Sequence, residues 1–536
     1  MMETEQFNNL FYIFAFLPTL GIFLGSALSI LYYSYLWQLK EYRLDRFVDN
    51  LRIKDGYKKL LPPLWGTKVL KVLIFLYFSF FGGGFNEGVL ALSIISIVAV
   101  FELMMIVYKV FERKVKRPKV TSRSILNLLV SLFLFLVFSF FIGGGVVKID
   151  DLFSWLVGML FADLGSIFVV SAGVFLVNPV SNFIKNLKVR SAKKKMQRFR
   201  NIKVVGITGS YGKSSVKEFL FQILEKKYKV LKTPGNVNTE IGVAEVVLKD
   251  LKDEHEIFVC EMGAYKMYEI KKICDVVMPD ISIVTAVSNQ HLGLFGSVQN
   301  LEKAKFEIVE NCKEGGVAIF NEEEKGAMKL FNWAKEKRKD LELVSVMAEK
   351  FLVNGAHLEF EFKGRFSTKL CGIQNIPNLV MAIECARKLG VEENLIVGAV
   401  KEIKGPPRTM ELVMETSEKV VIDDSYNTGP AAAAAAINYM ALFNGFKKIL
   451  VFPGMMELGE ISKVEHEKIG KLIAEKCDRL ILTSEDFIDE IREGMGEEMF
   501  KLKVRVLKFG DREKLKEVVD EECLGQKSVV IFESRY

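Results

Sequence analysis

The chain has 536 residues, half of them hydrophobic, and a formal net charge of +7. This length exceeds one ordinary domain, and the charge is unevenly divided: residues 1–203 carry 26 Lys and Arg against 12 Asp and Glu, whereas the remainder carries 47 against 54. Because the second part is mildly acidic, a nucleic-acid groove is disfavoured, and we expect no nucleic-acid partner.

The first region, residues 1–183, is predicted to be an all-α transmembrane bundle. The loops after its first, third and fifth apolar segments carry 24 Lys and Arg, whereas the opposite loops carry one Lys. Positive residues stay cytoplasmic, so we expect a multi-pass cell-membrane protein, in contact with membrane lipid, whose N-terminus lies outside and whose remainder after residue 180 is cytoplasmic. Five segments have about the length that a bilayer requires: 10–37, 69–85, 88–110, 124–146 and 152–178.

An internal repeat lies within this region. The stretch "FLYFSFFGGG" at 75–84 recurs as "FLVFSFFIGGG" at 135–145, and extending the alignment sets Glu102 opposite Asp163. Intramembrane carboxylates often mark a functional site. The alternative is that both pair with a neighbouring helix or reach interfacial water, and the sequence leaves the two interpretations open.

A predicted basic linker at 184–200 leads into a nucleotide-loop pattern, "NIKVVGITGSYGKSS". A β-branched strand, a glycine turn and an amphipathic helix aim backbone N–H groups at phosphate, bring Lys213 to the terminal phosphates and offer the Ser214 hydroxyl to Mg²⁺. Ile207 stands where the general G-x-x-x-x-G-K-[ST] pattern has its first Gly, so the match is to the variant T-G-x-x-G-K-[ST]. The residues predicted to bind ATP here are Thr208, Gly209, Ser210, Tyr211, Gly212, Lys213, Ser214 and Ser215.

The variant loop resembles that of the Mur ligase family, and closest are its D-alanyl-D-alanine-adding (MurF-type) members. Further motifs follow in family order: "TPGNVNTEIGV", "CEMGAYKMYEI", "NQHLGLFGS", "AKFEI", "IDDSYNTGP" and "GMMELGE". The resemblance implies two α/β domains after the membrane region, a P-loop central domain at 201–410 and a Rossmann-like C-terminal domain at 411–536.

The resemblance also implies an activity, the ATP-dependent formation of an amide through an acyl phosphate. The substrates would be a carboxylate acceptor and an amino acid or dipeptide, with D-Ala-D-Ala the leading amine. Two Mg²⁺ ions are implied, one held by Ser214 and Glu261 and one by His291 and Lys305, with Lys305 carbamylated. The alternatives are that His291 is structural and that Lys305 is a surface lysine.

Adenosine contacts are implied on both sides of a domain cleft. The family motif appears as "GIQNIPN", in which Gln374 replaces a His, and the amides of Asn375 and Asn378 either read adenine edges or cap the following helix. Arg408 and Asp424 match residues that the family places on phosphate and ribose. The implied catalytic set is therefore Lys213, His291, Lys305 and Arg408.

Two departures from the family leave the acceptor open. The chain ends "VVIFESRY" instead of the V-K-G-S-R type, and the membrane region occupies the place of the family's UDP-sugar-binding domain. The acceptor is thus expected to be a UDP-linked or a lipid-linked peptide precursor. A membrane ligase similar to poly-γ-glutamate synthase, and a degenerate ligase acting as a membrane scaffold, remain alternatives.

Overall fold

The structure, a computed structural model, divides into two compact units, Met1–Leu187 and Lys188–Tyr536. The residues that it describes are 2–44, 46–48, 60–61, 63–81, 85–112, 115–146, 152–287, 295, 297–354, 357–425, 429–455, 458, 461–497, 502–507 and 512–533.

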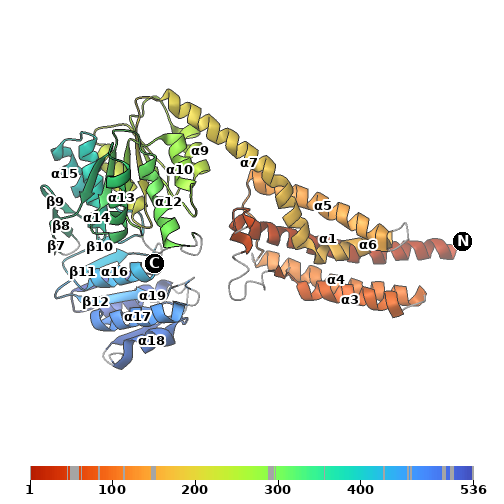
Figure 1. Cartoon of the computed structure of the whole chain (residues 1–536). Helices are drawn as coiled ribbons and strands as arrows, with labels where there is room; N and C mark the ends of the chain where they lie inside the picture. The colour runs from red at the N-terminus through yellow and green to blue at the C-terminus, as the bar shows by residue number, and fades with distance from the viewer. Residues whose placement is uncertain are drawn as a thin grey trace. The chain divides into compact units, whose positions relative to one another are not determined.

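The first unit is built from helices (Figure 1). Within the described residues, four stretches are long and apolar enough to cross a membrane: 19–39, 93–111, 122–142 and 166–198. The helices are α1 (Met2–Leu39), α3 (Trp65–Phe81), α4 (Phe85–Phe111), α5 (Ser122–Val146), α6 (Leu152–Leu164) and α7 (Ser166–Arg198).

One predicted span is corrected, and the predicted linker is helical over most of its length. The segment 152–178, predicted as one span, is divided between α6 and α7 at Gly165, where the α-helix assignment is interrupted. A glycine inside a helix costs about 1 kcal/mol relative to alanine, so a break is least costly there. The stretch 184–200, predicted as a basic linker, is part of α7 as far as Arg198, and Ala192 and Met196 within it are buried in the core of the second unit.

The two aligned carboxylates of the first unit are both buried and paired. Glu102 of α4 accepts from Lys71 at 2.5 Å and from the Thr67 hydroxyl at 2.9 Å, and Asp163 of α6 pairs with Lys68. The lysines lie three residues apart on α3 and therefore share one face of that helix. Pairing with a neighbouring helix, one of the two interpretations of these acids, is the observed arrangement.

The second unit begins with a middle domain around a six-stranded parallel sheet of order β2-β3-β1-β4-β5-β6. Alternate residues of β1 face opposite sides of this sheet. Val204 belongs to the core on the face that α9, α10, α12 and α13 cover, and Val205 belongs to the core on the face that α8, α14 and α15 cover. A small antiparallel sheet, β7-β8-β9, follows. The strands are β1 (Lys203–Thr208), β2 (Val230–Lys232), β3 (Ile257–Glu261), β4 (Ile281–Val284), β5 (Val317–Asn321), β6 (Glu342–Val346), β7 (Lys350–Asn354), β8 (His357–Glu361) and β9 (Arg365–Thr368).

The middle-domain helices connect these strands and include the helix that follows the glycine loop. They are α8 (Lys213–Leu224), α9 (Glu240–Asp250), α10 (Glu269–Val277), α12 (Val298–Glu310), α13 (Lys325–Lys337), α14 (Asn375–Lys388) and α15 (Glu393–Glu402). Strand β1, loop and α8 follow one another as the sequence predicts.

The C-terminal domain has a second six-stranded sheet of order β10-β11-β15-β12-β13-β14, parallel except for β10. Helices α16 and α17 cover one face and α19 covers the other, so this domain is α/β as the resemblance implies. The strands are β10 (Glu411–Glu415), β11 (Lys419–Asp423), β12 (Lys447–Phe452), β13 (Arg479–Leu482), β14 (Lys503–Val506) and β15 (Ser528–Phe532). The helices are α16 (Pro430–Met440), α17 (Ser462–Lys476), α18 (Ile488–Met495) and α19 (Arg512–Cys523).

Candidate active site

The glycine loop between β1 and α8 is packed so tightly that side chains at its glycines would collide with neighbours. A Cβ on Gly212, whose φ is +80°, would lie 2.6 Å from the Asn378 side-chain oxygen. A Cβ on Gly209 would overlap the Thr285 hydroxyl. The Ser210 N–H donates to the Ala286 carbonyl at 2.8 Å. The loop thus needs glycine at both positions, and its residues Gly209, Ser210 and Gly212 line the spaces described below.

Lys213 opens α8 and lies over the loop that it follows. Its ammonium donates to the carbonyls of Gly209 at 2.8 Å and Ser210 at 3.3 Å, and burial lowers its pKa. Of the other predicted loop residues, Thr208 donates its buried hydroxyl to the Met262 carbonyl, so this side chain supports the loop instead of facing a ligand. Ser215 lines the large cleft described below.

Ser214 and Glu261 come together as predicted. The β1–β3 register sets Ile207 beside Glu261, and the Ser214 hydroxyl donates to the Glu261 carboxylate at 2.9 Å. The other carboxylate oxygen accepts from the Asn238 amide at 3.0 Å. A hydroxyl and a carboxylate are the hard oxygen ligands that Mg²⁺ prefers, so this donor set fits the first predicted magnesium site.

Lys217, one helical turn after Lys213, is the unforeseen member of this group. Its side chain is fully buried, and its ammonium pairs with Glu261 at 3.1 Å and donates to the Gly235 carbonyl. The same residue thus fixes the carboxylate of Glu261 and the loop that contains Gly235. From the sequence alone, a lysine in a helix is typical of a solvated surface. No local signal marks Lys217 as a buried residue.

Lys305 lies on α12, buried to 4% exposure, and is not the surface lysine of the alternative interpretation. It lines a cavity of about 60 Å³ together with Gly209, Lys213 and Asn238. Burial, and then the charge of Lys213, lowers the pKa of Lys305 from 10.5 to about 7. His291, its predicted partner at the second metal, lies outside the described residues. Among the described residues no three His, Cys, Asp or Glu side chains are grouped as a metal site.

Glu307, two residues after Lys305, has a role that the sequence did not reveal. Its carboxylate accepts from the backbone N–H groups of Tyr268 at 2.5 Å and Lys271 at 2.9 Å, and so caps the N-terminus of α10 from another helix. Tyr268 itself supplies no side-chain cap. The capping bond therefore ties α12, and Lys305 with it, to α10.

A cleft of about 1800 Å³ extends from the loop to the predicted adenosine residues, and its lining includes Asn375, Asn378, Arg408 and Asp424. The Asn375 amide nitrogen donates to the Cys371 carbonyl at 2.7 Å, which ties the start of α14 to the preceding loop. A donor of this kind does not cap the N–H groups at a helix N-terminus. Asp424 accepts from the Met410 N–H at 2.9 Å, and burial raises its pKa to about 6.

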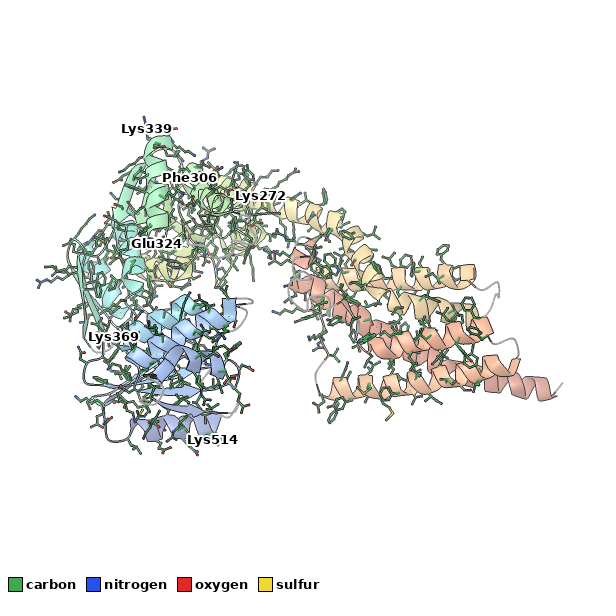
Figure 2. The ribbon with its side chains drawn as sticks, turned by 60° about the horizontal axis from the view of Figure 1, so that its bottom comes forward. Lys272, Phe306, Glu324, Lys339, Lys369 and Lys514 are labelled. Carbon is green, nitrogen blue, oxygen red and sulfur yellow. The ribbon has the colours of Figure 1, made fainter. Side chains whose placement is uncertain are left out.

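Glu324 lines the same cleft as Tyr211 of the glycine loop, and the Tyr211 hydroxyl donates to its carboxylate at 2.9 Å. Figure 2 labels Glu324, and also Phe306, which follows Lys305 on α12.

Comparison with known proteins follows the same division into domains. Residues 207–386 match the Mur ligase middle domain and residues 409–534 match the Mur ligase glutamate ligase domain at the C-terminus. The chain belongs to the Mur ligase family.

Among curated Mur ligases, the UDP-N-acetylmuramoyl-tripeptide--D-alanyl-D-alanine ligases of Bacillus subtilis and Escherichia coli are 28% and 30% identical, each over 288 residues. These matches cover 52% and 50% of this chain, and 62% and 61% of the relatives. The chain thus spans less than two thirds of the length of either relative.

Two solved structures of the MurF type are similar to this Mur ligase. MurF from Acinetobacter baumannii superposes with a TM-score of 0.58 at 26% identity, covering 65% of this chain and 77% of the other. MurF from Thermotoga maritima, solved in complex with ADP, superposes with a TM-score of 0.54 at 26% identity, covering 65% of this chain and 80% of the other. The resemblance to the MurF type drawn from the sequence motifs is confirmed.

His466 of the C-terminal domain supports the "GMMELGE" loop of this Mur ligase. Its Nε2 accepts from the Met455 N–H at 2.9 Å, its Nδ1 lies 2.7 Å from the Ser462 carbonyl, and its ring stacks on Phe487. The ring is fully buried and both nitrogens have partners. It therefore holds the start of the loop and has no nitrogen left for a substrate.

Proposed function

We propose that this protein is an ATP-dependent ligase that forms an amide bond in cell-wall precursor synthesis. The observation that carries the proposal is the position of Lys213 and the glycine loop between two adjoining spaces. Buried Lys305 lines the small cavity, and the Ser214–Glu261 pair lines the large cleft. The similarity to MurF-type relatives, one of them solved with ADP, supports ATP as the phosphoryl donor. D-Ala-D-Ala is proposed as the amine because the named relatives are UDP-N-acetylmuramoyl-tripeptide--D-alanyl-D-alanine ligases.

In the proposed reaction an acceptor carboxylate attacks the γ-phosphorus of ATP, and ADP leaves. The amine then attacks the acyl carbon of the resulting acyl phosphate, inorganic phosphate leaves, and the amine nitrogen loses a proton. Both steps place negative charge on phosphoryl oxygens, so positioned donors matter more than a covalent nucleophile. The loop N–H groups and Lys213 would supply these donors, and Arg408 would add a cation from across the cleft.

Mg²⁺ would be held by Ser214 and Glu261 and would supply charge neutralisation on the phosphates. Lys305, as a carbamate, would present anionic oxygens for a second ion beside His291. The buried position of Lys305 and its lowered pKa support this assignment, because only the neutral amine reacts with CO₂.

The test of this function uses purified full-length protein and measures ATP-dependent phosphate release with D-Ala-D-Ala. UDP-linked and lipid-linked peptide acceptors are compared, which also identifies the acceptor. Lys213→Ala should abolish release and product formation, whereas Lys303→Ala, an exposed lysine on α12, should retain both. Near-normal turnover of Lys213→Ala would refute the site, and inactivity of wild type with every acceptor would favour the scaffold alternative.

We further propose that the first unit crosses the cell membrane and that the ligase domains are cytoplasmic. Four apolar helices and the 24 to 1 asymmetry of basic residues support this topology. A cysteine introduced at 82–88 should react with an impermeant reagent in intact cells, and one introduced at 191–197 should not. The reverse labelling would place the ATP loop outside the cell and contradict the proposal.

A further inference from the structure

One face of α7 changes from apolar to basic along its length. Leu176, Val180, Phe183 and Leu187 are 60%, 51%, 62% and 46% exposed. Their spacings of four, three and four residues place them on a single face of the helix. An exposed row of large apolar side chains on a membrane-span candidate is the surface that faces lipid tails.

The row continues with cations on the same face. Arg190, Lys194 and Arg198 follow at spacings of three, four and four residues, and all three are exposed. Within the described part of the chain, none of the three forms an ion pair, whereas neighbouring Lys188 pairs with Glu245 at 2.6 Å. We call these three residues the basic stripe.

The other face of the same turns packs on the middle domain. Ala192 and Met196 are buried in its core, and Lys195 donates to the carbonyls of Leu248 and Leu251 at 3.0 and 2.7 Å, at the C-terminus of α9. The basic stripe lies about half a helical turn away from Ala192 and Met196. The stripe therefore takes no part in holding α7 against the ligase domains.

We propose that the basic stripe binds the phosphate headgroups of anionic phospholipids at the cytoplasmic membrane surface. The inference rests on the proposed membrane insertion and is independent of the proposed chemistry. From Ser166 to Leu187 the helix rises about 33 Å, close to the roughly 30 Å of a hydrocarbon core. Arg190 is less than one turn beyond Leu187, so the stripe begins where the headgroups begin.

Two other occupants fit the stripe less well. A second copy of α7 would match the apolar row, but it would set the cations of one stripe against those of the other. Nucleic acid would match the cations but not the exposed apolar row that runs directly into them. An anionic bilayer satisfies both halves of the face at once, because juxtamembrane Lys and Arg are attracted to acidic lipid.

The experiment reconstitutes the full-length protein in phosphatidylcholine vesicles containing trace spin-labelled lipid, either phosphatidylglycerol or phosphatidylcholine. Electron paramagnetic resonance measures how much of each probe is motionally restricted by the protein, which gives a relative association constant. Wild type should prefer phosphatidylglycerol. Its association constant relative to phosphatidylcholine should be up to about fivefold higher for a headgroup held by one cation, and salt should reduce that preference.

The decisive variant neutralises the stripe, R190Q/K194Q/R198Q, and should lower the preference toward one. Its matched control, K303Q/K401Q/K516Q, removes three exposed lysines from other elements and should keep the wild-type ratio. ATP-dependent product formation by both variants in detergent reports whether the ligase domains remain folded and active.

Other results would overturn the proposal in distinguishable ways. Equal ratios for wild type and the stripe variant would remove the lipid site. Crosslinking between copies through Lys194→Cys, without a lipid preference, would assign the stripe to self-association. Stripe-dependent binding of polyuridylate, without a lipid preference, would assign it to nucleic acid. Absence of any restricted lipid would refute membrane insertion itself, whereas inactivity with an intact lipid preference would refute only the ligase function.

Discussion

Replacement of Lys305 by alanine tests the least conventional part of the site, a lysine that acts as a carboxylate. An ammonium cannot ligate a cation, so the side chain must first lose its proton and then react with CO₂. At about pH 7.5 an amine with a pKa of 10.5 is neutral in about one molecule in a thousand, whereas one with a pKa of about 7 is neutral in about three quarters. Burial, together with the charge of Lys213, therefore raises the neutral fraction of this amine by a factor of several hundred.

We expect Lys305→Ala to lower the rate of product formation by orders of magnitude while nucleotide binding persists, because Lys213 and the loop amides are unchanged. High concentrations of formate or acetate should restore part of the rate by supplying oxygen ligands in the cavity. Lys303→Ala, two residues earlier on the same helix and exposed, should behave as wild type with and without these anions.

The rate of product formation and the carbamate content of Lys305 should both fall as the pH is lowered. Lys305 gains a proton as the pH falls through about 7, and at about pH 6 only about a tenth of the amines are neutral. Carbamate content, followed by the ¹³C signal after incubation with labelled CO₂, should therefore fall on the acidic side together with the rate. A fully active Lys305→Ala, or no carbamate signal in the presence of Mg²⁺ and ATP, would refute the reasoning.

Three further changes test buried contacts, two within the second unit and one within the first. Lys217→Met leaves Glu261 buried without its cation, and thermal unfolding of the full-length protein in detergent should show a loss of about 3–5 kcal/mol, an outcome that an unchanged transition would exclude. Glu307→Gln removes the charged cap of α10 and should cost about 1–3 kcal/mol by the same measurement. In the first unit, Lys71→Leu should be more destabilising than Lys71→Leu combined with Glu102→Leu, because only the single change leaves an unpaired buried charge.

Much of the fold follows from local signals in the sequence. The strand and helix on either side of the glycine loop are marked by a β-branched run and by a G-K-S turn, and the structure has them at Lys203–Thr208 and Lys213–Leu224. The lengths of the apolar segments predicted the helices of the first unit. They did not predict the break at Gly165, because the stretches on both sides of it are mostly apolar. The prediction of a basic linker at 184–200 did not include its helical form up to Arg198, since Ala192 and Met196 pack in the core of the second unit among residues remote in the sequence.

The candidate site was predictable where a residue's role is set by its own motif. Ser214 and Glu261 meet because strand ends of one parallel sheet meet at one edge. The supporting residues were not predictable, because their partners are remote in the chain. Lys217 reaches Glu261 across 44 positions, and Glu307 caps a helix that begins 38 residues earlier. For Asn375 the sequence offered an adenine contact or a helix cap, whereas the structure has a bond from its amide nitrogen to the Cys371 carbonyl.

The internal repeat of the first unit includes both acidic residues, but the lysines that pair with them occur in the first copy only. Glu102 and Asp163 occupy equivalent places, yet both cations come from α3, and the positions that align with Lys68 and Lys71 in the second copy are Leu128 and Ser131. An isolated buried charge is costly in a bilayer, whereas a closed pair is tolerated. A lysine of the first copy therefore neutralises the acid of the second copy. Through these two pairs α3 contacts both α4 and α6, and the four side chains together carry no net charge. A sequence repeat alone suggests two like sites, but the pairing shows one helix that fixes how the two copies associate.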